Sequence, residues 1–600
     1  MAMSTEDRNA AARVLTVGVV WVGALVGCAP HPGPEAALAK LTARVPGFQI
    51  VELPQRGRVE VSPDQGLTVS DLRGVPLDDD PPTLGERTVE YDRRMTDRFP
   101  PGQAPYVAQG IQPFRLRAFH CEFNYGGWHN WAMADYAATH GFSILSPYNH
   151  GVQEWTHVPE GTQWLKWGGF VNWHRWLPEH DIPAGRYDRL PGCDVVQTLT
   201  DEGVFKPNPG FDYLMIDMEH GVLPPATLRQ QPWYPADAAA SERRAFERRY
   251  YDGYATTYIA PVRAARQRGW RNISLYGWQP FPRTWFGLAE ASVDPATDHG
   301  WNAFGEAIYR EVDLLNPSVY CFYWSPQNVA YTLANIDLNM KLVNAADEAK
   351  PVRPYFWTLL HGGGEGWRWW RGQPIRSEDV RAMIAMAFFT GIDGFDTWNW
   401  SGTGNHHRPS LVHVDRKTRE RVLHDVMVGN TFQVTAEGAV EPTIFRRYDA
   451  LHILSVDDET GLVRFQRIEK ANAQGRYGCT PDKPVYTMRR DVLLGHLRAK
   501  SAPVAAMIEG MALVKPFERL LRRGEVRIDV SAQKQFAETL PIVRRVTHGD
   551  LHVLITYDPL WHEQDGPRRI VLEDFDGREG LILVVPADRQ TRIFVFRARF

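Results

Sequence analysis

The chain has 600 residues, of which 44% are hydrophobic and 23% charged, and this near-average globular composition excludes extensive disorder. The formal net charge is −4, from 67 basic and 71 acidic residues, which excludes a general attraction to nucleic acid or to anionic membranes. The length exceeds that of one ordinary domain and predicts several folded units.

Residues 1–28 have the pattern of an export signal. Arg8 and Arg13 precede an apolar run from Val14 to Val26, which is too short to cross a bilayer as a permanent helix. The run leads into Cys28 through a sequence that resembles a bacterial lipobox, in which the cysteine is lipidated and becomes the mature N-terminus. We expect an exported lipoprotein, periplasmic or on the cell surface, that reaches a membrane only through its lipid anchor. A plain cleaved signal peptide on a secreted protein is the alternative.

Residues 29–110 are predicted to form a tether and a small β-rich region. Closely spaced prolines follow Cys28, and short alternating runs at Gln49–Leu53 and Arg58–Val61 are typical of strands.

Residues 111–430 alternate apolar strands with helices, which predicts a parallel sheet closed into a (β/α) barrel of the TIM type. Seven strands are expected, at Arg115–Glu122, Phe142–Pro147, Tyr213–Glu219, Asn272–Trp278, Ser318–Trp324, Arg353–Leu360 and Gly394–Trp400, and no eighth strand is evident.

Two helices between these strands are clear. The first runs from Ser241 to Arg268, where tyrosines recur at a spacing of four and Gly269 acts as a stop signal. The second follows Ser377, where two acidic residues favour a first helical turn. Residues 431–600 then contain strand-like runs such as 451–454, 552–555 and 592–596, which predict a C-terminal β-sandwich.

One strand ends in two carboxyl groups. The apolar run from Tyr213 leads into Asp217 and Glu219, and the period of two places both side chains on one face of the strand. Two adjacent carboxyls cannot both ionise at low cost, so one should keep its proton near neutral pH. A protonated acid beside a carboxylate is what cleavage of a glycosidic bond requires. A structural carboxylate pair or a divalent metal site is the alternative for the same two residues.

The other strand ends supply aromatic and polar side chains to the same end of the barrel, which is the end where barrel enzymes have their active sites. Rigid rings with a polar edge suit the binding of sugars. The candidate substrate-binding residues are Glu122, Asn124, Trp278, Tyr320, Tyr355, Trp357, Asp396 and Trp398 at strand ends, and Arg368 in a Trp- and Gly-rich loop.

Nucleotide-binding and zinc-binding motifs do not occur in a plausible context. The sequence has no glycine-rich dinucleotide or phosphate loop where one could matter and no H-E-x-x-H helix. We therefore expect no cofactor, no metal and no nucleic-acid partner.

The order of these motifs resembles the hyaluronidases of the bee-venom and mammalian type over roughly residues 212–400. The matching phrases are Ile216–Glu219, Arg248–Tyr250, Tyr276–Pro280, Leu314–Tyr320, Pro354–Trp357 and Asp393–Trp398, in the same order as in that family. The resemblance implies an irregular barrel with fewer than eight strands. It also implies that Glu219 is the general acid/base and that Asp217 orients the 2-acetamido group of the substrate, whose oxygen attacks the anomeric carbon. Tyr320, Tyr355 and Trp398 would line the sugar subsite.

Three hypotheses about function follow from the sequence. The first is a glycoside hydrolase acting on a polysaccharide with 2-acetamido sugars, such as hyaluronan or chondroitin. The second is a hydrolase of another acidic or neutral glycan that uses Asp396 or Asp217 as nucleophile or base. The third is a non-catalytic surface lipoprotein that binds glycans, which would not need two adjacent acids.

Overall fold

The computed structural model describes most of the chain from Pro34 onward. The described residues are 34–54, 57–98, 107–124, 131–147, 160–171, 195–206, 210–218, 222–276, 299–321, 327–360, 375–398, 412–414, 421–423, 431–433, 450–457, 459–468, 484–489, 502–538, 540–559, 567–572, 580–586, 588 and 590–598. The lipidation candidate Cys28 lies outside them. No helix within these ranges is long and apolar enough to cross a membrane.

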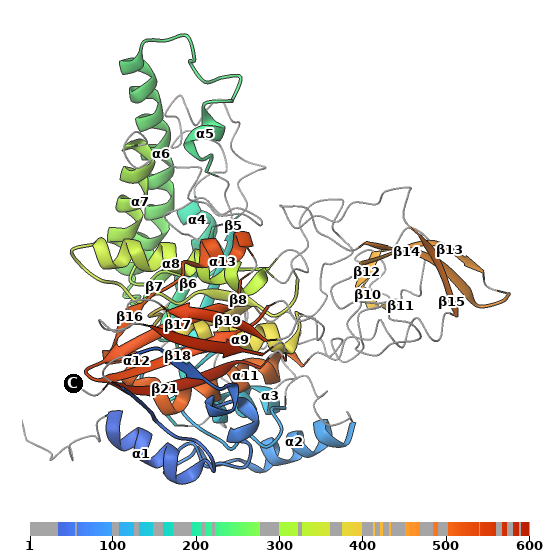
Figure 1. Ribbon diagram of the computed structural model, residues 1–600. Coiled ribbons are helices and arrows are strands. Elements are labelled where there is room, and N and C mark those ends of the chain that lie inside the picture. Colours follow the sequence, from blue (N-terminus) through green and yellow to red (C-terminus); the bar gives the residue numbers. More distant parts are fainter. Residues whose placement is uncertain are drawn as a thin grey trace, which may run out of the picture.

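The centre of the molecule is a curled, seven-stranded parallel sheet in a (β/α) barrel-like arrangement (Figure 1). Its strand order is β7-β6-β5-β4-β3-β9-β8. The strands are β3 (His120–Asn124), β4 (Ile144–Ser146), β5 (Gln163–Val171), β6 (Tyr213–Met218), β7 (Ile273–Leu275), β8 (Tyr355–Trp357) and β9 (Gly394–Trp398). Every neighbouring pair is parallel, as the alternation of strands and helices predicts.

The two edge strands of this sheet are joined by the short segment 315–318. Isolated parallel bridges link Asn316 of this segment to Tyr276, next to β7, and Ser318 to Tyr355 of β8. The backbone N–H of Tyr355 donates to the carbonyl of Pro317 (2.8 Å), and that of Val319 donates to the carbonyl of Tyr355 (3.1 Å). The sheet therefore curls far enough for this one segment to bridge its two edges.

Two expectations about the barrel need correction. No strand was expected between Phe142–Pro147 and Tyr213–Glu219, where the structure has β5, whose sequence mixes Trp, Gly and Lys without an apolar run. The strand expected at Ser318–Trp324 is present as isolated bridges at 315, 316 and 318. The sheet itself has seven strands, which agrees with the expected irregular barrel of fewer than eight, and segment 315–318 adds only isolated bridges.

Helices surround the sheet. They are α3 (Trp131–Thr139), α4 (Val195–Asp201), α6 (Ala240–Gln267), α7 (His299–Glu311), α8 (Asn328–Ala345) and α9 (Ser377–Phe388). The tyrosine stripe of α6 packs with α7 and with the outer face of β6 and β7 in one buried cluster. Both α6 and α9 begin within a residue of the positions that the sequence predicts.

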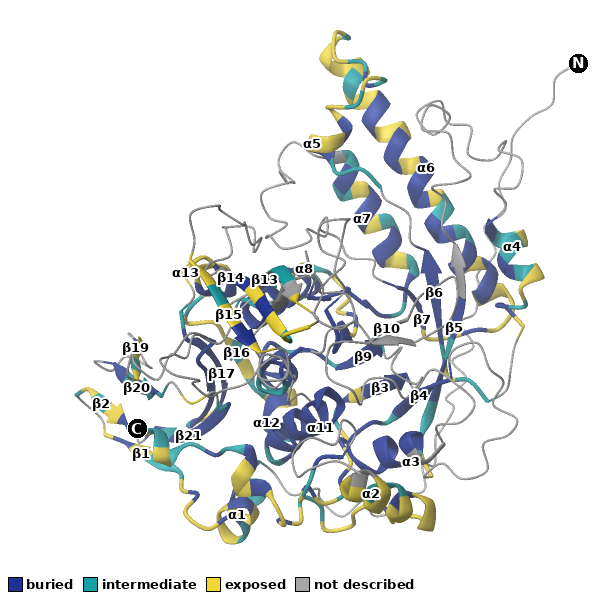
Figure 2. Cartoon of the chain, turned by 90° about the vertical axis from the view of Figure 1, so that its right-hand side faces the viewer, coloured by how far each residue is buried: buried dark blue, intermediate teal, exposed yellow. Residues whose placement is uncertain are grey.

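The helix α6 is longer than the barrel is deep. Its 28 residues span about 42 Å, whereas the six residues of β6 span about 20 Å. Figures 1 and 2 show α6 and α7 rising beyond the strands together with the short helix α5 (Pro225–Leu228). We call residues 222–260 the arm.

The C-terminal β-sandwich expected for residues 431–600 is not confirmed. Within residues 502–538, the helices α11 (Pro503–Val514), α12 (Glu518–Arg523) and α13 (Ala532–Glu538) precede the last strands. Every residue of α11 is buried (Figure 2), and α11 packs against α9 of the barrel.

The strands that follow form two sheets with N-terminal partners. The five-stranded sheet has the order β1-β21-β18-β17-β16, and the three-stranded sheet has the order β19-β20-β2. Their strands are β1 (Val51–Leu53), β2 (Val59–Val61), β16 (Glu525–Arg527), β17 (Ile542–His548), β18 (Leu551–Tyr557), β19 (Arg568–Leu572), β20 (Leu581–Val585) and β21 (Arg592–Ala598). Both N-terminal strands pair in parallel, β1 with β21 and β2 with β20.

One hydrophobic cluster lies between these two sheets and contains Leu53, Val61, Leu554, Leu583 and Phe596. The opposite face of the five-stranded sheet joins the large core that also holds α9 and α11. Residues before 62 and residues after 540 therefore share one core, although the sequence assigns them to separate regions.

A further group of strands belongs to residues 412–489. Two of them, β10 (Val412–Val414) and β11 (Arg421–Leu423), form an antiparallel pair. The other four form an antiparallel sheet of β12 (Thr431–Gln433), β13 (Ala450–Asp457), β14 (Leu462–Ile468) and β15 (Val485–Arg489), in this order. Figure 1 shows these strands at the right of the view.

Candidate functional site

The candidate site lies at the carboxyl end of the barrel strands, which we call the mouth. Asp217 is one residue from the described end of β6 and is 1% exposed. Its neighbours Ile216 and Met218 belong to the cluster that packs on α6 and α7, so the alternation of the strand turns Asp217 to the barrel interior. Its expected partner Glu219 lies outside the described residues, as do Trp278 and Arg368.

Six aromatic side chains form a continuous cluster inside the mouth. Trp398 lies against Trp167 with ring centroids 4.1 Å apart and planes at 79°, and Tyr276 lies against Tyr355 at 5.0 Å and 82°. Tyr320 contacts Tyr355 at 6.2 Å and Trp357 at 5.5 Å. These edge-to-face and tilted contacts stabilise the cluster beyond the burial of its area.

The structure thus brings together four of the expected sugar-binding residues, namely Tyr320, Tyr355, Trp357 and Trp398. Two members of the cluster were not predicted as site residues. Trp167 was not among the predicted site residues because no strand was expected at the position of β5. Tyr276 lies two residues before Trp278 in the expected strand Asn272–Trp278, and this shared face was the signal that could have identified it.

A buried ion pair lies deeper in the barrel than the aromatic cluster. The Arg353 guanidinium donates to both oxygens of Asp396, from Nη2 at 2.5 Å and from Nε at 3.2 Å. The Asn316 amide also donates to Asp396. Asp396 is 0% exposed and Arg353 is 2% exposed, so these three side chains fill the barrel below the mouth and hold β9 to β8.

Glu122 lies beside this pair and is also 0% exposed. Its Oε2 accepts hydrogen bonds from the backbone N–H of Thr397 (2.7 Å) and from the Thr397 hydroxyl (3.3 Å). Burial, and after it the charge of Asp396, raises the pKa of Glu122 well above its usual range. Glu122 and Asp396 were both expected to bind substrate; in the structure Asp396 bonds to Arg353 and Asn316, and Glu122 bonds to Thr397.

Asn124 is the mouth-side neighbour of Glu122 on β3. Its backbone N–H donates to the Thr397 hydroxyl oxygen at 3.0 Å, and its side chain hydrogen-bonds to Tyr355. Burial raises the pKa of Tyr355 well above its usual range, so this phenol stays protonated. Asn124 therefore links β3 to the aromatic cluster.

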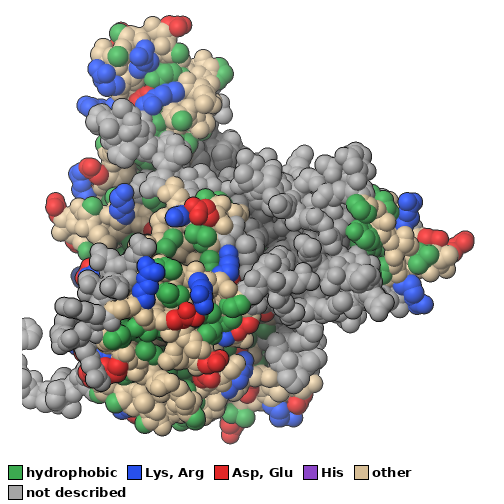
Figure 3. Space-filling model, in the orientation of Figure 1, with side chains coloured by type: hydrophobic (Ala, Val, Ile, Leu, Met, Phe, Trp, Pro, Cys, Tyr) green, Lys and Arg blue, Asp and Glu red, His purple; other side chains and the backbone are tan. Residues whose placement is uncertain are grey.

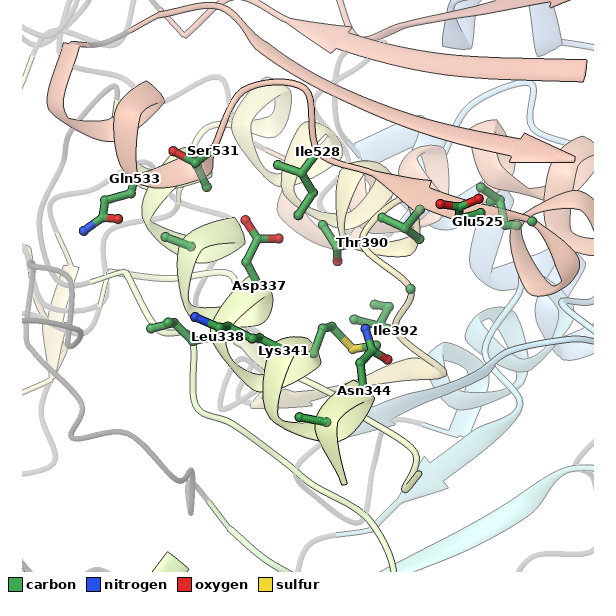
Figure 4. Close-up of a pocket in the computed structure, with 18 of the residues that line it drawn as sticks. Asp337, Leu338, Lys341, Asn344, Thr390, Ile392, Glu525, Ile528, Ser531 and Gln533 are labelled. Carbon is green, nitrogen blue, oxygen red and sulfur yellow. The ribbon is translucent and has the colours of Figure 1, made fainter. Parts of the chain in front are cut away.

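A cavity of about 790 Å³ lies elsewhere, in a groove between α8, the turn before β9 and the edge strand β16. Figure 4 shows Asp337, Thr390 and Asn344 pointing into it, with Ile392 and Ile528 beside them. It has no aromatic lining residue, and it lies at the amino end of β9, opposite the mouth. It therefore lacks the stacking surfaces of a sugar site.

The described residues contain no group of three or more His, Cys, Asp or Glu side chains that could hold a metal ion. The buried Cys121 and Cys321 are free thiols. The chemistry available within the described part of the mouth therefore comes from carboxyl, amide, phenol and indole groups.

Comparisons with known proteins give no family for the chain. No family model matches it, and no curated protein matches it. Among solved structures, bee venom hyaluronidase in complex with a hyaluronic acid tetramer is 16% identical, covers 46% of this chain and 90% of its own, and has a TM-score of 0.31. The endo-beta-1,4-mannanase from Thermotoga petrophila is 11% identical, with 80% and 91% covered and a TM-score of 0.30. The alpha-amylase from Geobacillus thermoleovorans, complexed with acarbose, is 8% identical, with 82% and 99% covered and a TM-score of 0.33. Similarity at this level leaves the function to be inferred from the site residues.

Proposed function

We propose that the protein is a glycoside hydrolase that cleaves a polysaccharide, with Glu219 as general acid/base and Asp217 as its assisting carboxylate. One observation carries the proposal. A buried carboxyl group, Asp217, faces the interior at the same end of a parallel barrel as six clustered aromatic side chains. Active sites of barrel enzymes lie at this end, and aromatic rings with polar edges are the surfaces that sugars stack on.

The substrate that we propose contains 2-acetamido sugars, as hyaluronan and chondroitin do. In that mechanism the acetamido oxygen of the substrate attacks the anomeric carbon while Glu219 protonates the leaving oxygen, and Asp217 orients the acetamido N–H. The sugar would contact Tyr320, Tyr355 and Trp398, with Trp278, Trp357, Asn124 and Arg368 around it. The sequence resemblance supports this assignment of roles.

Its hydrogen bonds disfavour Asp396 as an alternative nucleophile. Both of its oxygens accept from Arg353 or Asn316. A nucleophile needs an oxygen that can reach the anomeric carbon. We therefore retain Asp217 and Glu219 as the reacting pair.

Wild-type protein and Glu219→Gln should be incubated with a panel of acidic and neutral polysaccharides, and reducing ends should be measured over time. Glu219→Gln removes only the transferable proton, so it should abolish turnover while keeping the melting temperature and polysaccharide binding of the wild type. Full activity in this variant would remove Glu219 from the reaction. Binding without release of reducing ends by the wild type would instead identify a non-catalytic glycan-binding protein.

Asp217→Asn distinguishes the acetamido mechanism from a simple acid role. Loss of the neighbouring charge should lower the alkaline limb of kcat/KM and slow turnover of acetamido-containing polymers. Full activity with an unmoved alkaline limb would exclude Asp217 as partner and would exclude the acetamido-assisted mechanism.

We further propose that the protein is exported and lipidated on Cys28, on the basis of the Val14–Cys28 pattern. Labelled palmitate should be incorporated by the native protein in an expressing bacterium and not by Cys28→Ser. Export without label would indicate a plain signal peptide.

A further inference from the structure

Below the mouth, two neighbouring buried carboxyl groups lie near one guanidinium, which bonds to only one of them. Glu122 of β3 and Asp396 of β9 are both 0% exposed, and Arg353 before β8 is 2% exposed. Both bonding nitrogens of Arg353 donate to Asp396. Asp396 is therefore compensated as an anion, whereas no cation bonds to Glu122 among the described residues.

The bonds of Glu122 fit a carboxylic acid better than a carboxylate. Its Oε2 accepts two hydrogen bonds from Thr397, whereas its Oε1 is buried with no hydrogen-bond partner in the described part of the chain. A buried anionic oxygen without a donor is costly, and the nearby charge of Asp396 adds to the cost. A proton on Oε1 removes the negative charge, and Oε2 can still accept both hydrogen bonds from Thr397.

The position of Glu122 gives this proton a structural consequence. The parallel pairing of β3 with β9 ends at Cys121 and Phe395. Beyond that point, the N–H of Asp396 bonds to Pro354 beside β8, so the next N–H along β9, that of Thr397, points towards β3. There it meets the Glu122 side chain in place of a backbone carbonyl.

The same threonine connects both strands to the mouth. Its hydroxyl oxygen accepts from the N–H of Asn124, and it directly precedes Trp398 in the aromatic cluster. Glu122 is thus the link that holds β9 to β3 where the two strands reach the mouth.

We propose that Glu122 is a positioning residue that works as a carboxylic acid: it fixes Asn124 and Trp398 at the mouth, and it does so only while it keeps its proton. The charged and titratable groups that face it are Asp396 on β9, Arg353 before β8 and Tyr355 on β8. Only the sugar-binding role of Asn124 and Trp398 rests on the proposed function.

The sign of the pH dependence follows from burial, which raises the pKa of folded Glu122 well above its usual range. In the unfolded chain a glutamate ionises near about pH 4.3. The contribution of Glu122 to stability is therefore fully present below that pH and is lost as the pH rises through its raised pKa in the folded protein. The melting temperature of the wild type should fall on the alkaline side.

Three variants test the proposal in full-length protein, with melting temperature measured from about pH 5 to about pH 9. Glu122→Gln keeps the shape and the acceptor for Thr397 but cannot ionise, so it should melt near the wild type at the acidic end and above it at the alkaline end. Glu122→Ala removes the link and should melt lower at every pH. Glu525→Gln, which removes a carboxylate that is 70% exposed, should keep the wild-type pH dependence.

If the melting temperature of Glu122→Gln fell at alkaline pH as much as that of the wild type, the proposal would be overturned, because the titrating group would then be another residue. Equal destabilisation of the Gln and Ala variants at all pH values would also overturn it, because Glu122 would then act as an anion. Near-ultraviolet circular dichroism gives a second readout, since the aromatic signal should be lost with rising pH in the wild type and retained in Glu122→Gln. Both readouts need no substrate, so they remain decisive even if the polysaccharide panel shows no cleavage.

Discussion

Gly394 lets β9 approach β3 more closely than any other residue could. Its φ is +152°, and a Cβ built on it would lie 1.7 Å from the carbonyl oxygen of His120. Backbone atoms cannot give way as a flexible side chain can, so the contact between the two strands requires glycine.

Gly394→Ala should therefore push β9 away from β3 and lower the melting temperature or prevent accumulation of folded protein. Gly85→Ala is the matched control, because its added Cβ would meet only the Asp135 carboxyl at an ordinary 3.5 Å. Thermal melts of both variants test this, and a Gly394→Ala protein as stable as the Gly85→Ala control would contradict the observed strand contact.

His140 should make the protein lose stability in acid. Burial lowers its pKa from 6.5 to about 4, while its ring stacks on Tyr136 at 4.0 Å and its Nδ1 hydrogen-bonds to the Tyr136 carbonyl at 2.8 Å. The stability that depends on neutral His140 is present above pH 6.5 and is lost as the pH falls towards about 4, at a total cost of about 3 kcal/mol.

His140→Phe keeps a ring against Tyr136 but cannot be protonated. Its melting temperature should depend less on pH between these limits, even though the loss of the hydrogen bond lowers it throughout. Thr139→Val removes a neighbouring hydrogen bond without removing the titrating ring, and it should keep the acidic fall. If the melting temperature of the wild type and of both variants fell equally in acid, groups other than His140 would be responsible for the loss of stability.

At the scale of elements, the arm has a charge pattern suited to an acidic polymer. Because β6 runs towards the mouth and α6 returns to the start of β7, the first half of α6 projects on the mouth side. Arg244 and Arg248 are exposed there one helical turn apart, a like-charge spacing that disfavours an isolated helix. Figure 3 shows Lys and Arg side chains gathered over the arm.

Replacing both Arg244 and Arg248 with Glu should raise KM for an acidic polysaccharide several-fold, weaken the salt dependence of KM, and leave kcat near the wild-type value. Arg271→Glu is the control, because Arg271 is exposed beside the amino end of β7, which is the end away from the mouth. KM measured at low and at high salt distinguishes an effect of the arm from an effect of the surface around Arg271. Equal effects of both changes would indicate nonspecific attraction.

Elements with a strong local pattern could be predicted from sequence, and elements defined by their neighbours could not. The α6 helix has a tyrosine stripe and a glycine stop, and it was predicted to within one residue. The β5 strand exists because β4 and β6 pair on its two sides, which its composition does not reveal. The α11 helix is buried all round, so it lacks the amphipathic period that marks a surface helix.

The site divides in the same way. Asp217 and the aromatic strand ends could be predicted because strand direction and a period of two decide where they point. The Arg353–Asp396–Asn316 network could not, because its members come from three separate segments and bond only after the sheet has curled. The same reason hid the burial of Glu122, which Thr397 and Asp396 determine from the neighbouring strand.

At the scale of the whole molecule, the N-terminal strands should control the order of the C-terminal sheets. Val61 is completely buried between the two sheets, and it pairs with Leu583 on the adjacent strand β20. Val61→Asp would place an unpaired charge in this core, at a cost of several kcal/mol. Limited proteolysis should then cut within residues 567–598, more than 500 positions away from the substitution.

Glu60→Gln is the matched control, because the Glu60 side chain is half-exposed on the same strand and bonds to Arg569. It should leave the C-terminal strands as protected as in the wild type. Equal protection in Val61→Asp would mean that β2 is dispensable to these sheets.

The pairing of β1 with β21 also determines when folding can be completed during synthesis of the chain. Val51 pairs with Phe596, and Glu35 forms an ion pair with Arg597 at 2.5 Å, so segments made at the beginning and at the end of synthesis are neighbours. A ribosome must release almost the entire chain before β1 and β2 have partners, and until then both remain unpaired strand-forming segments that need protection from aggregation. The same closeness should allow a circular permutant, in which a short linker joins residue 598 to residue 34. Its new termini could lie in an exposed turn such as the one at Gly549, between β17 and β18.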